Sequence, residues 1–294
     1  MSDSNRRVVE LLNFLAAHPT QSFNLSELAS RLALSYGSAH RVLSTLTEAG
    51  YLTRHPKHKT YSLGLALAAI GQATLERHPV VAIAQREMTR LAEELGVQCI
   101  ASAVTGRHML FIAKAGSSTT AEGVIKTGEQ RPLMPPLGLG HIAWAKQPEI
   151  NAYLDRAGPE LSAQRRQFLN NAMAVVRERG YAMSVLEAGM LALAEAIRQH
   201  HDEQHQPDYW AQMAKQVAPL SNDEMQLLAL EDLAGRRLSH ISAPIFNSDG
   251  EVLFELSLSG LPPGLTHVQA TTIIERLLAV TAVITSESHG RKPR

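Results

Sequence analysis

The chain has 294 residues, 45% of them hydrophobic, which is enough for two domains with separate cores. Its 28 basic and 28 acidic residues balance, which excludes a polycation that binds nucleic acid over its whole surface. The single cysteine, Cys99, excludes internal disulfides and cysteine-rich zinc modules, and its apolar surroundings predict a buried free thiol. We find no signal-peptide pattern and no unbroken apolar span, so we expect a cytoplasmic protein without a membrane partner.

Residues 1–64 carry seven basic and four acidic side chains, a net charge of +3, so the remaining residues together carry −3. A mildly basic segment before a mildly acidic one fits a nucleic-acid contact confined to one end of the chain. The first expected helix spans residues 5–18, presents a broad apolar face and is followed by Pro19.

Two further helix starts follow. Asn24 and Glu27 have the spacing of a capping box, in which each side chain hydrogen-bonds the backbone N–H of the other. Apolar residues then recur at helical spacing up to Leu32. After a short turn, Ser35 is a second N-cap, and a second apolar stripe runs towards Gly50, where a helix would stop. Two short helices joined by a tight turn are typical of a helix-turn-helix.

The second helix of this pair leaves small polar residues and one arginine off its apolar stripe. Such a helix fits the major groove of DNA, where its early turns touch base edges. The candidate DNA-contacting residues are Ser35, Tyr36, Gly37, Ser38, His40, Arg41, Ser44 and Thr45. Glycine is a poor helix former, so we attribute Gly37 to close approach between this helix and DNA.

A charged hairpin follows. Two β-prone runs, residues 51–54 and 60–63, flank a basic turn, and Gly64 closes the segment. Arg54, Lys57 and Lys59 are expected to lie along phosphates or in the minor groove. A small helical domain can also end in a hairpin with exposed lysines for no functional reason. The order helix, turn, helix and charged hairpin is more specific than any one piece, and it favours DNA binding.

The rest of the chain changes from helices to a mixed pattern. Residues 65–77 and 80–95 are expected to be helices that connect the two domains. A helical connector can transmit a change in the body to the head, which a flexible Gly/Ser linker could not. Strands are expected at residues 97–104, 108–115, 121–126, 239–247 and 251–260, helices at 141–146, 149–156 and 163–180, and a capped final helix at 266–286. Strands that bracket helices predict an α+β body.

A helical segment interrupts this body, with helices expected at residues 189–199, 209–217 and 222–230, the last of them opened by a capping box of Ser221 and Glu224. It contains His200, His201 and His205, and the last two have a spacing that loosely resembles a zinc signature. The position of the catalytic base holds Asp202, and no third ligand is evident. A solvated polar turn therefore accounts for these histidines better than a metal site, and we predict no metal.

These motifs resemble the IclR family of bacterial transcription regulators over nearly the whole chain. The head matches through NLSELASRLALSYGSAHRVLSTLTEAGYLTRHPKHKTYSLG, and the body through GEQRPLMPP, RERGYA, ISAPIFNSDGEVLFELSLSG and the final helix. The resemblance implies a mixed fold, an all-α winged helix-turn-helix domain and an α+β GAF-like domain joined by a helical linker. It also implies double-stranded operator DNA and a small organic effector as partners, a homodimer or dimer of dimers as the assembly, and no cofactor.

The implied domains are a DNA-binding domain at residues 1–64, a linker and dimerisation segment at 65–95, and an effector-binding domain at 96–289. Two departures from the family lie beside the implied effector pocket. The loop at residues 133–140 lacks the family's usual His and Lys, and the acidic cluster after Ala182 is reduced to Glu187. Residues from about 188 to 237 form an insertion, so the effector's identity does not carry over from the family.

Residues 251–260 alternate between two faces. Val252, Phe254, Leu256 and Leu258 form the expected core face, whereas the other face holds Glu255, Ser257 and Ser259. Alternation alone favours a solvated polar face. In the family this stretch lines the effector cavity, so the resemblance assigns Ser257 and Ser259 to effector binding. Glu255 is a further candidate: it disfavours an anionic effector unless a cation offsets its charge, and it either binds a donor group of the effector or bonds locally. The other candidates implied are Met134, Leu137, Gly138, Gly140 and His141.

Three functions were weighed against these observations. The first is a ligand-responsive regulator of transcription. The second is a hydrolase or metal-dependent enzyme with an incidental helical N-terminus, but the sequence has no nucleophile elbow, no phosphate loop and no supported carboxylate pair, so we predict no catalytic residues. The third is a protein-interaction module that uses the winged head as a scaffold. Its only support is that this fold serves many functions.

Overall fold

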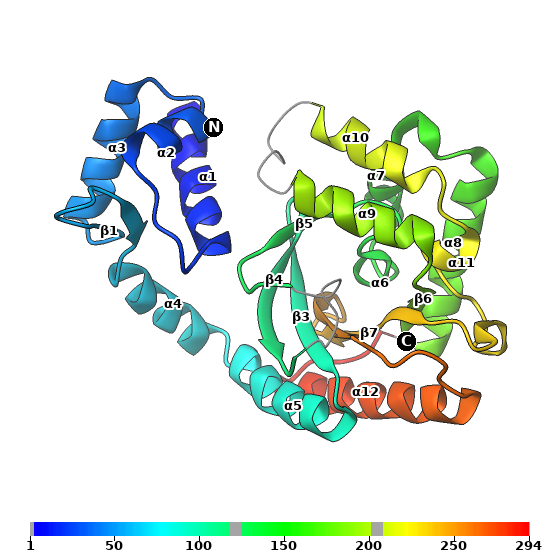
Figure 1. The fold of residues 1–294 in the computed structure, drawn as a ribbon. Helices are drawn as coiled ribbons and strands as arrows, with labels where there is room; N and C mark the ends of the chain where they lie inside the picture. Colours follow the sequence, from blue (N-terminus) through cyan, green and yellow to red (C-terminus); the bar gives the residue numbers. More distant parts are fainter. Residues whose placement is uncertain (1–2, 118–124, 201–207, 294) are drawn as a thin grey trace. The chain divides into compact units, whose positions relative to one another are not determined.

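The computed structural model describes residues 3–117, 125–200 and 208–293 and divides the chain into two units (Figure 1). The head unit comprises Met1–Pro79 with Lys126–Glu129, and the body unit comprises Val80–Ile125 with Gln130–Arg294. The predicted fold class is confirmed, because a helical domain with a hairpin precedes an α+β domain.

The head unit packs three helices against a two-stranded hairpin. Its elements are α1 (Asp3–Ala17), α2 (Leu25–Arg31), α3 (Tyr36–Glu48), β1 (Leu52–Arg54), β2 (Tyr61–Leu63) and α4 (Ala66–Arg77). The predicted capping box of Asn24 and Glu27 is present, and the Ser35 hydroxyl accepts a hydrogen bond from the Ser38 N–H. One core joins the first three helices to the hairpin through Leu11, Leu15, Leu28, Leu32, Leu43, Leu46, Leu52 and Tyr61.

The body unit is built on a six-stranded antiparallel sheet with the strand order β5-β4-β3-β8-β7-β6. The strands are β3 (Gln98–Thr105), β4 (His108–Ala115), β5 (Gln130–Pro132), β6 (Ala182–Val185), β7 (Leu238–Phe246) and β8 (Val252–Ser259). The central pair β3 and β8 joins the N-terminal and C-terminal hairpins of the body, so Gln98 and Ser259, 161 positions apart in sequence, lie opposite each other.

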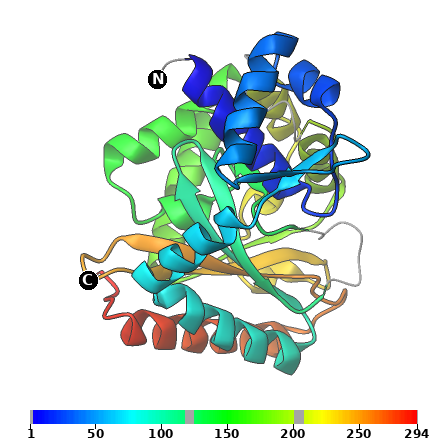
Figure 2. The same cartoon turned by 90° about the vertical axis from the view of Figure 1, so that its left-hand side faces the viewer.

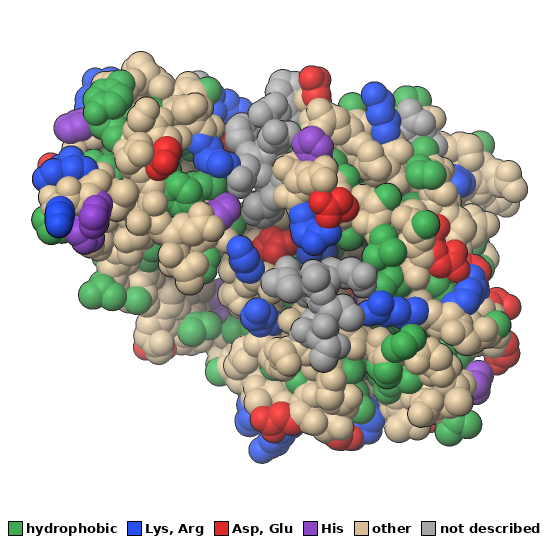
Figure 3. Space-filling view, in the orientation of Figure 1, with side chains coloured by type: hydrophobic (Ala, Val, Ile, Leu, Met, Phe, Trp, Pro, Cys, Tyr) green, Lys and Arg blue, Asp and Glu red, His purple; other side chains and the backbone are tan. Residues whose placement is uncertain are grey.

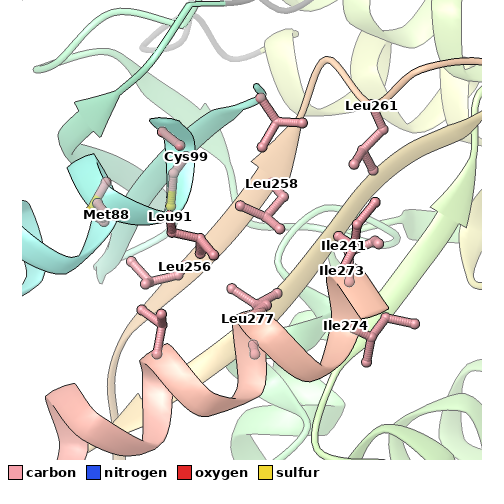
Figure 4. Packing of buried hydrophobic residues seen from close by; sticks show 14 of the residues in the cluster. Met88, Leu91, Cys99, Ile241, Leu256, Leu258, Leu261, Ile273, Ile274 and Leu277 are labelled. Carbon is pink, nitrogen blue, oxygen red and sulfur yellow. The ribbon is translucent and has the colours of Figure 1, made fainter. Parts of the chain in front are cut away.

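Two helices cover one face of the sheet. These are α5 (Val80–Leu95) and α12 (His267–Glu287), which lie side by side against the strands (Figure 2). Leu256 and Leu258 of β8 pack with Leu91 of α5 and Leu277 of α12 (Figure 4). Cys99 lies in this core, where burial raises the pKa of its thiol to about 12, so the prediction of a buried free thiol is confirmed.

The apolar helix α12 is long and hydrophobic enough to cross a membrane by length and composition alone. Its apolar side is buried against the sheet and α5, with Leu277 and Ile284 fully inaccessible. Packing in the core of the body therefore accounts for its hydropathy.

The opposite face of the sheet is covered by helices and turns that follow β5 and β6 (Figure 1). They are α6 (Leu139–Ile142), α7 (Gln147–Asp155), η2 (Gly158–Glu160), α8 (Ala163–Arg179), α9 (Ala188–Gln199), α10 (Tyr209–Val217), α11 (Asn222–Met225) and η4 (Glu231–Leu233). A second apolar core joins these helices to one another, and Tyr153, Leu169 and Met213 lie at its centre.

Several predicted elements differ from the structure. The helix expected from residue 222 to 230 ends at Met225, because Gln226 adopts an extended conformation. The strand expected at residues 121–126 falls mainly outside the described residues, and the edge strand lies at Gln130–Pro132 instead. Strand β6 was not predicted, since all four of its residues are buried and it has no polar alternation.

Candidate functional site

The outer face of α3 carries the polar residues that the sequence singled out. Tyr36 is 64% exposed, and Ser35, Gly37, His40, Arg41 and Thr45 are also exposed. Ser38 and Ser44 are half-buried, and the apolar residues Ala39, Leu43 and Leu46 face the head core. The helix is therefore held by one side and presents the other side to solvent.

Gly37 leaves empty space on this face, since a side chain built at this position would meet no atom within 4 Å. Packing within the protein therefore does not require a glycine here. The backbone of the first turn of α3 is open to close approach from outside, as expected for a helix that enters a groove.

The hairpin follows α3 directly and presents its charged tip to solvent. β1 pairs with β2 in register from Leu52 opposite Leu63 to Arg54 opposite Tyr61, and Tyr61 anchors the hairpin in the head core. Arg54, Lys57 and Lys59 are all exposed. Lys, Arg and His side chains gather over this part of the head unit (Figure 3).

The hairpin tip has a defined shape. The His55 ring accepts hydrogen bonds at Nδ1 from the N–H groups of Lys57 and His58, at 3.2 and 3.1 Å, and the ring of His55 lies 4.5 Å from that of His58. Lys59 adopts a positive φ of 57° and returns the chain to β2. The two lysines are thus displayed on an ordered turn.

The body unit contains a cavity of about 170 Å³ between the sheet and the covering helices. Its floor is the sheet face opposite α5 and α12, formed by residues of β3, β4, β7 and β8. Its roof is largely α9, which contributes Met190, Leu193 and Ile197. One wall is the segment from Pro136 to Gly140, which ends in the first turn of α6. The cavity therefore combines an apolar roof with a partly polar floor, as a small-molecule site requires.

Cross-strand pairing places the polar floor residues next to one another. Ser102 lies opposite Glu255, and Ser257 lies opposite both Ile100 and Ser242. The Ser259 hydroxyl donates to Gln98 Oε1 at 3.3 Å, further along the same face. The face that could have been solvated is thus covered, because α6 and α9 lie over it.

Glu255 is the charged group at the centre of this floor, and it is 4% exposed. Burial raises the pKa of its carboxyl to about 7, and a hydrogen bond from Ser242 opposes that shift. Its Oε1 has no hydrogen-bond partner among the described residues. A side chain at position 140 would lie 1.7 Å from this oxygen, so only Gly140 lets the carboxylate pack against α6.

His141 of α6 lies behind the cavity wall and contacts the same carboxylate. Its Nε2 is 3.4 Å from Glu255 Oε2 and 3.0 Å from Ser102 Oγ. Burial lowers the pKa of His141 to about 4, so the imidazole is neutral at pH 7 and does not neutralise Glu255. Tyr153 is the other titratable group beside this pair, and burial and the charge of Glu255 raise the pKa of its phenol.

Ser102, His141 and Glu255 have the composition of a catalytic triad but not its geometry. In a triad, the serine and the acid bind opposite nitrogens of the imidazole, so that the acid orients the base. Here both oxygens approach the same nitrogen, Nε2. This arrangement gives the serine no separate proton acceptor held by the acid, and it does not support the hydrolase alternative.

Two polar side chains, the buried Glu224 and the half-buried Arg165, hold the roof in place. The Glu224 carboxylate accepts hydrogen bonds from the N–H groups of Met190 at 2.7 Å and Ser221 at 2.9 Å, so it caps the starts of both α9 and α11. The Arg165 guanidinium of α8 donates to the carbonyl oxygens of Val217, Ala218 and Leu220 at the end of α10. The roof is therefore attached at its helix ends rather than only by apolar packing.

The structure places six of the eight predicted effector residues at the cavity: Leu137, Gly138, Gly140, Glu255, Ser257 and Ser259. Met134 does not line this cavity, because its side chain is fully buried in the helical core. His141 lies behind the cavity wall and acts through Ser102 and Glu255. His201 and His205 lie outside the described residues, within which no cluster of metal ligands occurs.

Sequence reasoning did not identify Ser102, Ser242 or the roof residues of α9. Ser102 interrupts an apolar strand, and Ser242 precedes an apolar stretch of β7, so each was a polar residue in a buried context. That signal was present in the sequence. The roof had no such signal, because apolar residues at helical spacing are equally typical of a helix that lines no cavity.

Comparisons with known proteins agree with this architecture. Residues 5–56 match the family model of the IclR helix-turn-helix domain, and residues 72–206 match that of the bacterial transcriptional regulator IclR C-terminal domain. The HTH-type transcriptional regulator XynR of Escherichia coli (strain K12) is 24% identical over 204 residues, which are 67% of this chain and 81% of XynR.

Solved structures share the fold over almost the whole chain. The IclR transcriptional regulator of Alicyclobacillus acidocaldarius has a TM-score of 0.69 at 18% identity and covers 98% of this chain and 99% of its own. An IclR homologue of Microbacterium hydrocarbonoxydans, solved in complex with 4-hydroxybenzoate, has a TM-score of 0.65 at 17% identity, with 97% and 98% covered. From the two matched domains and the shared fold, we conclude that this chain belongs to the IclR family of transcriptional regulators.

Proposed function

We propose that this protein binds operator DNA as a homodimer and that a small organic effector in the body cavity modulates its affinity for the operator. In this proposal α3 enters the major groove, and the β1–β2 hairpin follows the phosphate backbone. The observation that carries it is the exposed polar face of α3 directly beside an ordered turn with two exposed lysines. Repression or activation then depends on where the operator lies relative to a promoter.

The roles on DNA differ between the helix and the hairpin. Arg41 is the one basic side chain on the described face of α3 apart from His40, and a guanidinium can contact two acceptors of a guanine at once. Lys57 and Lys59 are point charges on a turn and are suited to phosphates, which carry no sequence information directly. Arg41 is therefore assigned to specificity, and the lysines to general affinity.

The exposed apolar side chains of α4 support a homodimer. Leu65 at its start is 88% exposed, Ile70 is 46% exposed and Leu75 is 44% exposed, and α4 has no buried residue. A helix of this composition gains stability only if a partner covers it. Two heads related by a twofold axis match two half-sites of a palindromic operator, which one head cannot do with useful affinity.

The cavity and its connections support effector control. The IclR homologue of Microbacterium hydrocarbonoxydans, solved in complex with 4-hydroxybenzoate, shows that a protein of this fold binds a small aromatic compound. In this chain the cavity floor includes β3, β4 and β8, and α5 packs on the other side of β3 and β4. Because α5 follows α4 after two residues, an effector that binds differently to two arrangements of the body shifts the heads between them.

Operator binding tests this proposal. In titrations with a palindromic fragment from upstream of the regulated promoter, we expect Arg41→Ala to weaken binding by ~1–3 kcal/mol and to relax base preference at one position of each half-site. Lys57→Ala and Lys59→Ala should weaken specific and non-specific binding about equally and reduce the salt dependence of the affinity, because each removes a phosphate contact.

Arg90→Ala is the matched control, since Arg90 is an exposed arginine on the body helix α5 and pairs with Glu87. It should leave operator affinity unchanged. If Arg41→Ala behaves as Arg90→Ala does, α3 is not the reading element and the proposal fails.

A further inference from the structure

We propose that the body cavity selects a small organic amine, a molecule the size of one ring with an apolar body and a protonated amino group, and that Glu255 binds this group. The proposal rests on the proposed function only in taking the cavity as the effector site. It names the chemical class of the effector, which the family resemblance leaves open.

The size of the cavity sets the first limit. Its volume of about 170 Å³ is close to that of an engineered cavity of roughly 150 Å³ that accommodates benzene. A nucleotide or a disaccharide exceeds this space, whereas a single ring with a short substituent fills it. The apolar side of the ligand belongs against Met190, Leu193 and Ile197 of the roof, with Phe111 beside it on the sheet.

The polar floor sets the second limit through Glu255. Glu255 lines the cavity and is 4% exposed as a residue, and its Oε1 packs against Gly140 without a hydrogen-bond partner among the described residues. Within the described part of the chain, His141 is the one basic group at ion-pair distance, and it is neutral at pH 7. A buried carboxylate without a cation is costly, so a ligand ammonium group that supplies the missing positive charge is favoured.

Two arginines also line the cavity, and they do not reverse this preference. Arg131 lies on the edge strand β5, three strands away from Glu255 on β8, and its guanidinium stacks 5.3 Å from the Phe111 ring. Arg237 immediately precedes β7. Both arginines interact with other groups of the protein, although Arg237 Nε, like Glu255 Oε1, has no hydrogen-bond partner among the described residues. The residue of β7 opposite Glu255 is Pro244, far along the strand from Arg237, so the charge at the centre of the floor is negative.

Three probes with the same ring distinguish a cationic, a neutral and an anionic ligand: benzylamine, benzyl alcohol and benzoate. They are titrated into the full-length protein by calorimetry at pH 7.5, with thermal shift as a second readout. We expect benzylamine to bind about tenfold or more tightly than benzoate, because only the amine offers a charged donor to Glu255. Benzyl alcohol should lie between them.

Variants assign the effect to Glu255. Glu255→Gln should lose about tenfold or more of benzylamine affinity while binding benzyl alcohol about as well as the wild type does. Glu255→Asp, which keeps the charge, should retain the order of the three probes. Glu251→Gln is the matched control, since Glu251 is exposed in the turn before β8.

Tighter binding of benzoate than of benzylamine to the wild type overturns the proposal. An equal benzylamine affinity in wild type and Glu255→Gln, or no benzylamine binding at millimolar concentration, does the same. Operator titrations with the same proteins stay separate from these outcomes, because they test the role of α3 and do not depend on which ligand the cavity prefers.

Discussion

Glu255 shows how the surroundings of a residue change its chemistry. In the chain it is one polar residue in an alternating strand, with an ordinary pKa of 4.5. In the structure α6 and α9 cover it, and burial raises that pKa to about 7. The groups that face it are His141 of α6, Tyr153 of α7 and the Ser242 and Ser102 hydroxyls of the neighbouring strands. The carboxyl therefore ionises in the folded protein only at a cost.

This cost predicts a pH dependence of stability. A carboxyl whose pKa is raised on folding binds its proton more tightly in the folded state, so its contribution is fully present below pH 4.5 and is lost as the pH rises through about 7. At roughly 1.4 kcal/mol per pKa unit, ionisation of Glu255 lowers the free energy of unfolding by about 3 kcal/mol. Glu255→Gln cannot ionise, so it should gain stability relative to the wild type between pH 5 and pH 8.

Denaturant unfolding of both proteins at these two pH values measures the difference. Burial also lowers the pKa values of His141 and His240, so these histidines make both proteins more stable as the pH rises. Their effect is present in both proteins and largely cancels in the comparison. A stability difference that stays flat from pH 5 to pH 8 contradicts the buried, partly protonated carboxyl.

At the scale of elements, the segment from α9 to α11 matters because it roofs the cavity. It is fixed by Glu224 at the start of α9 and by Arg165 at the end of α10. The sequence predicts an insertion from about residue 188 to 237, but the family model of the C-terminal domain extends to residue 206 and so includes α9. Substitutions in this segment alter the roof of the cavity, so ligand preference can change without any change in the head.

Arg165→Ala tests the attachment of the roof. The variant removes charged hydrogen bonds to three carbonyl oxygens, so we expect a loss of about 2 kcal/mol in the free energy of unfolding. Arg166→Ala is the neighbouring control, because its partner Asp155 is exposed and such pairs contribute about 1 kcal/mol or less. Urea unfolding of both variants measures the difference. Equal losses would show that Arg165 does not hold the roof.

At the scale of the whole molecule, α4 connects a DNA-reading head to a ligand-binding body and is itself uncovered. A monomer leaves Ile70 and Leu75 exposed. A twofold dimer through α4 would bury these residues in both copies of the chain. We propose that the second copy of the chain, which binds the other half-site of the operator, is also the partner that covers α4.

Ile70→Glu tests this assignment. It places a charge on the exposed side of α4, so we expect at least a tenfold weaker dimer in sedimentation velocity, with weaker operator binding as a consequence. The free energy of unfolding of the monomer should change by about 0.5 kcal/mol or less, because Ile70 buries little within one chain. Gln72→Glu adds the same charge at an exposed polar position of α4 and should leave the dimer intact. A dimer that tolerates Ile70→Glu uses another surface.

The sequence by itself determined the features that depend on near neighbours. The capping boxes at Asn24, Ser221 and Thr266 join residues three positions apart, and all three form in the structure. The same holds for the β1–β2 and β7–β8 hairpins and for the exposed face of α3, because helical periodicity separates Arg41 from Leu43 whatever the rest of the chain does.

Only the tertiary structure decided what the polar face of β8 does. Alternation placed Glu255, Ser257 and Ser259 on one side, but a solvated face and a cavity floor have the same pattern. The difference arises from α9, more than 50 residues earlier, and from β3, which pairs with β8 across more than 150 residues. Burial, an unpartnered carboxylate oxygen and a shifted pKa are properties of such long-range contacts, so no local pattern in the chain could contain them.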